Sequence, residues 1–308
     1  MLSKKLFISF IIIFLFINFT KAQEIKIVSK VDDKIITNLD IEIEKKYLLL
    51  LNNRLKKLNE KEFFILAKNS LIREIIKKKE INKSFKKRDE KIKNKIIENF
   101  YTRLGFKRKN EFIKFLDSNR INFENLKEKL IIEAFWNQLI FIKFKDRIRI
   151  DKNAIEKDII NYYNSIDKKY EFNLSEIVID VEKDVILKKK EIFKYIKEFG
   201  FRVAANKYSK SDTSKYGGEI GWVKSSRLNK KIKKKISEIN IGEITDPIQT
   251  SNGYLFLKLN DKREIKEKLD LENELKQQVE FEKNRQLNQF SLIYYKKIKK
   301  NTSIYESK

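Results

Sequence analysis

The sequence predicts an α+β protein that is mostly helical, with a helical domain followed by a smaller domain built on a β-sheet. Apolar residues recur at helical spacing along residues 23–168. Strand-like runs and most of the glycines lie within residues 169–261. The chain contains a single proline and seven glycines, which argues against a loop-rich β-sandwich.

The composition fits two folded domains and excludes several kinds of catalytic chemistry. A chain of 308 residues, of which 41% are hydrophobic, can bury a core. It contains neither cysteine nor histidine. These absences exclude zinc sites of the usual ligands, Ser-His-Asp triads and Cys-His dyads. We therefore expect no metal ion and no cofactor.

The formal charge of +26 is of the kind found in nucleic-acid-binding proteins. The basic residues are spread along the chain, however, and lysine is enriched together with isoleucine and asparagine, whose codons are also rich in A and T. We interpret the charge as solvated helix faces and expect no nucleic-acid partner. An attraction to acidic clients, or a peripheral contact with an anionic membrane surface, stays open.

The first 22 residues have the pattern of a signal peptide. Lys4 and Lys5 precede an apolar run from Leu6 to Phe19, and Thr20-Lys21-Ala22 places small residues where a signal peptidase cuts. The run is shorter than the roughly 20 residues that a membrane-spanning helix needs. We expect an exported, soluble protein whose mature chain begins at Gln23; an uncleaved N-terminal anchor is the alternative.

The mature chain opens with a predicted hairpin that leads into helices. Ile27 and Val31 precede the turn Asp32-Asp33-Lys34, and Ile35-Ile36 follow it. Thr37 to Asp40 then has the form of a capping box, with Asp in place of the more usual Glu or Gln.

Six helical segments follow within the first domain, each identified by apolar residues at helical spacing. They run from Ile43 to Leu58, Phe63 to Ile75, Ile92 to Phe100, Phe112 to Leu116, Phe123 to Ile142 and Ile155 to Tyr162. Gly105 is expected to stop the third helix, and Asn122 to cap the long fifth one.

The pattern changes to that of a sheet near Tyr170. A strand-like run from Phe172 to Ile179 is followed by helix and then by Gly217-Gly218, which suits a tight turn. Asp246-Pro247 is expected to begin a strand, and Asn252-Gly253 to form a hairpin turn. These signals predict a four-stranded antiparallel sheet with flanking helices over residues 169–261. A helical pattern then returns from Lys262 to about Lys300.

Four short blocks follow one another in this second domain. They are Tyr208-Ser209, Gly217-Gly218-Glu219-Ile220-Gly221-Trp222, Gly242 to Thr250, and Asn252-Gly253-Tyr254. In order and spacing they resemble the parvulin (PpiC-type, rotamase) family of peptidyl-prolyl isomerases.

The segment from Ile25 to Asp40, with helices behind it, resembles the N-terminal domain of the SurA family of periplasmic chaperones. Members of that family commonly carry two parvulin modules, where this chain has one. The resemblance implies a periplasmic location and a C-terminal helix, residues 262–308, that returns to complete the helical domain. The apolar stripe from Leu269 to Ile293 also needs a partner.

The resemblance also points to a candidate site. Parvulins have two histidines on adjacent central strands, a nearby Cys or Asp, and apolar residues that hold the proline ring. The histidine positions fall on Glu176 and Leu255, the Cys or Asp position on Ser211 or Asp212, and the substrate-binding positions on Leu228, Ile232 and Trp222. Since Glu176 and Leu255 cannot form a hydrogen bond between their side chains, we expect a degenerate site.

The resulting functional hypothesis is a chaperone for unfolded secreted or outer-membrane polypeptides that binds extended chain with little turnover. An active prolyl isomerase acting on exported proteins is the alternative, and a purely structural parvulin domain is a third possibility. The sequence indicates no particular oligomeric state.

Overall fold

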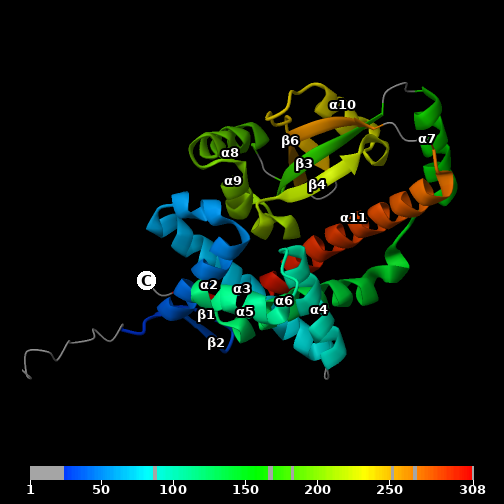
Figure 1. The fold of residues 1–308 in the computed structure, drawn as a ribbon. Coiled ribbons are helices and arrows are strands. Elements are labelled where there is room, and N and C mark those ends of the chain that lie inside the picture. Colours follow the sequence, from blue (N-terminus) through cyan, green and yellow to red (C-terminus); the bar gives the residue numbers. More distant parts are fainter. Residues whose placement is uncertain are drawn as a thin grey trace, which may run out of the picture.

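The computed structural model describes residues 24–85, 89–165, 169–181, 184–250, 253–265 and 269–306. The expected signal peptide at residues 1–22, and Asn252 of the expected hairpin turn, lie outside these ranges. In Figure 1, the helices of residues 38–144 lie in the lower part of the molecule, the four-stranded sheet lies above them together with the helices of residues 185–237, and the long helix Leu271–Lys300 runs below the sheet.

The first part of the chain forms a short hairpin and a bundle of helices, as the sequence predicts. Its elements are β1 (Ile27–Val31), β2 (Lys34–Thr37), α2 (Asn38–Leu51), the 3₁₀ helix η1 (Asn53–Lys57), α3 (Glu60–Ser84), α4 (Glu90–Arg103), α5 (Lys109–Ser118), α6 (Phe123–Phe144), the 3₁₀ helix η2 (Lys145–Arg147) and α7 (Lys152–Ser165). We call the elements from β1 to η2 the arm. Helix α7 lies away from the arm, beside the first turns of the long helix (Figure 1).

The predicted caps are present. The hydroxyl oxygen of Thr37 accepts a hydrogen bond from the Asp40 amide at 3.3 Å, and the Asp40 carboxylate accepts one from the Thr37 amide at 2.7 Å. Asn122 caps α6 by accepting from the Asn125 amide at 3.0 Å. Each cap satisfies backbone donors that a helix start leaves unpaired.

One predicted helix is shorter than expected. Helix α2 ends at Leu51, and the apolar pattern up to Leu58 continues only through η1. Asn52 separates them in extended conformation, where its side chain accepts from the Arg54 amide and donates to Asn206 at 2.7 Å. The side-chain hydrogen bonds compete with helix continuation, a common behaviour of asparagine.

The second part of the chain forms the predicted four-stranded antiparallel sheet, in the order β4-β3-β6-β5. Its elements are β3 (Lys169–Ile179), α8 (Val185–Phe199), α9 (Phe201–Tyr208), the 3₁₀ helix η3 (Asp212–Tyr216), β4 (Glu219–Lys224), the 3₁₀ helix η4 (Ser225–Arg227), α10 (Lys230–Ser237), β5 (Ile248–Thr250) and β6 (Gly253–Ile265). The prediction that helix returns at Lys262 is wrong, because β6 continues to Ile265. Its polar end pairs with the start of β3, Lys169 lying opposite Ile265.

The C-terminal segment forms the long helix α11 (Leu271–Lys300) and a short strand, β7 (Ile304–Glu306). Strand β7 pairs with β1 and completes a three-stranded sheet in the order β2-β1-β7. The two ends of the described chain therefore lie side by side (Figure 1). Helix α11 contacts α6 and α3 of the arm as well as α7.

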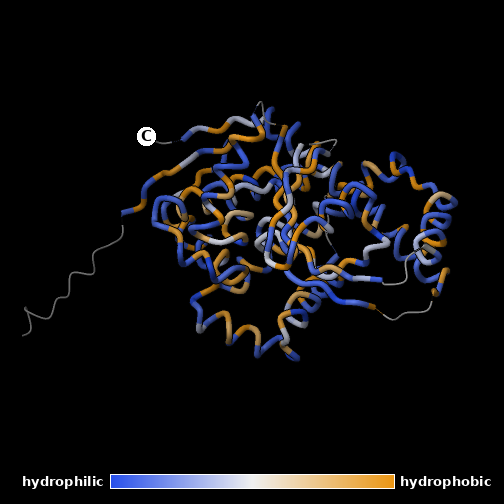
Figure 2. Tube along the Cα trace, turned by 90° about the horizontal axis from the view of Figure 1, so that it is seen from above, coloured by the Kyte–Doolittle hydropathy of each residue, from blue (hydrophilic) through white to orange (hydrophobic). Residues whose placement is uncertain are grey.

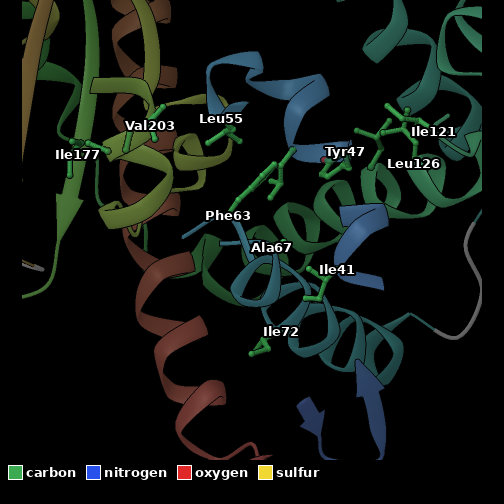
Figure 3. Close-up of a cluster of buried hydrophobic side chains, with 14 of the residues drawn as sticks. Ile41, Tyr47, Leu55, Phe63, Ala67, Ile72, Ile121, Leu126, Ile177 and Val203 are labelled. Atoms are coloured by element: carbon green, nitrogen blue, oxygen red, sulfur yellow. The ribbon is translucent and has the colours of Figure 1, made fainter. Parts of the chain in front are cut away.

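Three apolar clusters hold these layers together. The largest is continuous between the arm and the sheet, and Figure 3 shows Ile177 and Val203 facing Leu55 and Phe63 across it. A second cluster joins α3, α6 and α11 around Trp136. The third lies on the opposite face of the four-stranded sheet, where α10 covers it.

The charged residues are only partly on solvated helix faces, contrary to the simple interpretation of the net charge. Lys45, Lys77 and Lys129 are buried. Lys129 pairs with Glu44 at 2.6 Å and also with Glu74. A buried lysine is tolerated when carboxylates compensate its charge.

In Figure 2, hydrophobic and hydrophilic residues are mixed along most of the trace. Within the part of the chain that the structure describes, no helix combines the length and the apolar character needed to cross a membrane.

Candidate functional site

The two histidine positions of the resemblance lie on neighbouring strands and on the same face of the sheet. Glu176 on β3 pairs with Leu257 of β6, and Leu255 pairs with Val178. The face is the one that carries the third apolar cluster, since Leu174 and Leu257 belong to that cluster. Along the two strands, one residue pair, Ile177 with Phe256, lies between the pair that contains Glu176 and the pair that contains Leu255.

Glu176 is held by hydroxyl groups from η3 and the residue before it. Its Oε1 atom accepts a hydrogen bond from Ser211 Oγ at 2.7 Å and another from Thr213 Oγ1 at 2.9 Å. The two hydroxyls also contact each other at 3.1 Å. A polar site therefore exists, but it is built between β3 and η3 and does not extend across to β6. Sequence reasoning missed Thr213, although a hydroxyl residue two positions after Ser211 was a usable signal.

The environment of Glu176 favours its neutral form. Burial raises the pKa of this carboxyl and the nearby charge of Asp212 adds to the effect, while the hydrogen bonds from Ser211 and Thr213 oppose it. The net direction is upward from the usual value of a glutamate. A carboxyl in its neutral form can donate a hydrogen bond as well as accept one.

The backbone of Glu176 is positioned by Gly218. The Glu176 amide donates to the Gly218 carbonyl at 2.7 Å. Gly218 has a φ of +77°, and a Cβ there would lie 2.2 Å from the Glu176 carbonyl oxygen. Only glycine allows this approach without displacement of β3. The predicted Gly217-Gly218 turn is thus part of the site's support.

Ser211 and Asp212, the two alternatives for the third position, point in different directions. Ser211 contacts Glu176, whereas Asp212 accepts from Lys77 at 3.2 Å and from Ser291 of α11 at 3.3 Å. The carboxylate of Asp212 therefore serves the contact between the sheet domain and the rest of the chain.

Lys77 is the centre of that contact. Its side chain is 2% exposed, and its ammonium group pairs with Glu133 at 2.9 Å as well as with Asp212. Lys215 also pairs with Glu133, at 3.1 Å. Burial alone would raise the pKa of Glu133, but the charges of Lys215 and Lys77 hold this pKa well below its usual range. The loop that supports Glu176 is thus clamped to α3 and α6.

The apolar residues that were expected to hold a proline ring lie along the third cluster. Leu228 is 8% exposed and belongs to the core of that cluster. Little of its side chain is therefore available for contact with a bound proline ring. Ile232 and Leu255 are partly buried at its edge. Phe281 of α11 packs against the same cluster. Ile232 and Leu255 are therefore more accessible than Leu228.

Trp222 is not brought to this surface. Its neighbour Val223 belongs to the third cluster, so Trp222 points to the other face of the sheet. There the guanidinium of Arg263 lies over the indole ring, 4.2 Å from its centre. The expectation that Trp222 lines the same site as Glu176 is not met by this geometry.

Among the described residues, no group of three or more acidic side chains is placed to hold a metal ion.

Comparison with known proteins connects this geometry with a family. A family model for the PPIC-type PPIase domain (Rotamase) matches residues 180–261. The chaperone SurA of Pseudomonas putida is 26% identical over 165 residues, which cover 50% of this chain and 38% of that protein. The chain is thus similar to SurA and contains a parvulin-type domain. The match of the family model begins just after β3, so it does not include Glu176.

Two further proteins with similarity to this chain are a foldase and a chaperone of known structure. The foldase protein PrsA 2 of Bacillus cereus is 28% identical over 205 residues, covering 66% of this chain and 64% of that protein. The chain thus spans less than two thirds of the length of either of these curated relatives. Among solved structures, a SurA-like chaperone of Campylobacter jejuni is 15% identical, with a TM-score of 0.37 and coverage of 92% of this chain and 99% of that chain.

Proposed function

We propose that this protein is a periplasmic chaperone that binds unfolded secreted or outer-membrane polypeptides, and that its parvulin domain binds extended chain with isomerase activity near background. One observation carries the proposal. Leu255 stands where the second histidine is expected, and Glu176 Oε1 already accepts hydrogen bonds from Ser211 and Thr213. The names of the relatives, chaperone and foldase, support the general role.

The low isomerase activity follows from what the reaction requires. Rotation about a peptide bond passes through a twisted state roughly 20 kcal/mol uphill, and a catalyst must bind that state better than the planar ones. Leu255 offers no hydrogen bond to the twisted amide. Loss of comparable electrostatic help in other enzymes costs about 3 to 4 kcal/mol, or two to three orders of magnitude in rate.

Binding does not need that help. The side chains of Ile232 and Leu255 are partly buried at the edge of a cluster that is already apolar. A proline or aromatic side chain laid against them gains about 25 cal/mol for each Å² of apolar surface removed from water. The sheet domain can therefore hold a client segment without catalysing its isomerisation.

An active isomerase built around Glu176 is the second candidate, and the upward direction of the pKa of Glu176 favours it. A neutral carboxyl could donate a hydrogen bond to the twisted amide from its second oxygen. In that case the carboxyl would take over the role of the family's histidines.

Replacement of Ile232 by Ser tests the binding surface. We expect the affinity of the full chain for an unstructured peptide with adjacent aromatic and proline residues to fall about fivefold to tenfold, because a partly buried isoleucine contributes roughly 1 to 1.5 kcal/mol. Fluorescence anisotropy with a labelled peptide measures this change. The matched control is Ile142→Ser on α6, which removes an isoleucine that is 50% exposed. Equal affinities for both variants, with unchanged circular dichroism, would place the binding surface elsewhere.

A further inference from the structure

A second groove continues from the site along the end of β3. Its volume is about 250 Å³, and it lies between β3 and the last turns of α11. The groove is lined by Val178, Asp180, Val181, Lys210, Leu292, Ile293 and Lys296. Val178 is two residues from Glu176 and on the same face of the strand. An extended peptide that crosses the Glu176 site in line with β3 therefore reaches this groove.

The walls of the groove expose apolar side chains from two parts of the chain. Val181, just after β3, is 73% exposed, and Ile293 on α11 is 51% exposed. Large apolar side chains on a protein surface that gather around a concavity mark binding sites more often than isolated ones do. The groove is thus formed jointly by the parvulin domain and by the C-terminal helix.

The rim carries more positive than negative charge. Lys296 forms an ion pair with Asp180. Lys210 is exposed and, within the described ranges, has no carboxylate at ion-pair distance. Although Lys210 is exposed, the surrounding protein removes part of its hydration and this lowers its pKa; Asp180 opposes the effect, and the charges of Arg73, Lys299 and Lys296 add to it. Arg73 and Lys299 line the adjoining cavity between the parvulin domain and the arm.

We propose that this groove binds the part of a client that flanks the site, and that it selects segments in which acidic side chains stand beside apolar ones. Val181 and Ile293 would contact the apolar side chains, and Lys210 would pair with a carboxylate. The inference rests on the proposed function, because it assigns a substrate class to the same peptide-binding surface. If the groove binds acidic segments, part of the high positive charge of the chain contributes to the recognition of clients at this one site.

Three peptides test the selection. They share a central aromatic-proline core and carry glutamate, glutamine or lysine at the flanking positions beside a leucine. Anisotropy titrations at a fixed ionic strength compare wild type, Lys210→Glu and Lys95→Glu. Lys95 is exposed on α4 of the arm, so its replacement changes the net charge equally at a remote place.

We expect the glutamate peptide to bind wild type most tightly, and Lys210→Glu to weaken it about fivefold to tenfold while leaving the glutamine peptide within twofold. Lys95→Glu should change neither by more than twofold. An equal effect of both variants would mean that general charge attraction explains the preference and would overturn the inference. If the glutamine peptide binds and depends on Ile232 but the glutamate peptide gains nothing, the inference fails and the proposed function stands. If no peptide binds, both fail.

Discussion

Truncation after Asp270 is expected to unfold most of the arm, because α11 supplies one wall of its core. The helix contributes Tyr294 as a buried side chain, and Leu287, Phe290, Tyr295 and Ile298 pack around the second cluster. Each such side chain contributes roughly 1.5 to 3 kcal/mol when fully buried. Only Tyr294 is fully buried and the other four contribute a part of that value, so that together they supply several kcal/mol of the 5 to 15 kcal/mol by which folded proteins are typically stable.

Specific contacts add to the apolar packing. The Trp136 indole nitrogen donates to Ser291 Oγ at 2.9 Å, and the Trp136 ring stacks on Tyr294 with centroids 5.8 Å apart. Truncation removes this hydrogen bond and exposes the indole to water, a net loss of about 0.5 to 1.5 kcal/mol for the hydrogen bond. We therefore propose that α11 completes the arm, as the resemblance to SurA implied.

Hydrogen exchange measures the result directly. Amides of α6 and α3 should lose protection after truncation, whereas the β3–β6 ladder should stay protected. The control truncation after Lys300 removes residues 301–308, including β7, whose three residues pair with β1, and should leave α6 protected. Full protection of α6 without α11 would show that the arm has a self-sufficient core.

The second large effect is expected from Lys77→Met. The substitution keeps most of the length of the side chain but removes both ion pairs of a buried ammonium group, so that Asp212 keeps only its hydrogen bond from Ser291. We expect the free energy of unfolding to fall by about 3 kcal/mol, at the low end for a broken buried pair because Glu133 keeps Lys215. Urea denaturation followed by circular dichroism measures the change.

The neighbouring lysine provides the matched control. Lys78 is 42% exposed and pairs with Glu128 at 2.5 Å on the surface. Lys78→Met should therefore cost less than about 1 kcal/mol. Similar losses for the two variants would mean that the contact between the parvulin domain and the arm does not depend on the Lys77 charge.

Local signals predicted the local structure well. A few adjacent residues were enough to predict three features: the capping box at Thr37, the cap at Asn122 and the Gly217-Gly218 turn. Each of these predictions is confirmed. The four-stranded sheet was also predicted, because its strands are marked by apolar runs and turn residues.

The features that the sequence did not predict depend on partners far away in the chain. Strand β7 is three residues long and is stabilised by pairing with β1. The polar end of β6 looks helical by itself and becomes a strand through its pairing with β3. Lys77 looks like a solvated lysine until Asp212 is placed beside it, 135 residues later. Such pairings have no signature within a local window.

At the candidate site, too, the sequence predicted some features, while others depend on contacts between residues that are distant in the chain. The positions of Glu176 and Leu255 on adjacent strands followed from the resemblance, and the structure places them on one face. The contact of Ser211 and Thr213 with Glu176 depends on how η3 packs against β3, which the spacing alone did not determine. Trp222 was assigned to the site from its motif, although strand alternation places it on the other face.

The central claim is that client binding has been kept while catalysis has been lost, and one experiment on a single purified sample tests it. Aggregation of an unfolded outer-membrane protein and the rate of isomerisation of a proline peptide are measured side by side, for wild type and for Glu176→Gln. We predict that both proteins suppress aggregation equally and that neither accelerates isomerisation beyond the uncatalysed time of roughly 10 to 100 s. A strong acceleration by wild type that disappears in Glu176→Gln would contradict the account and would make Glu176 the catalytic group of an active isomerase.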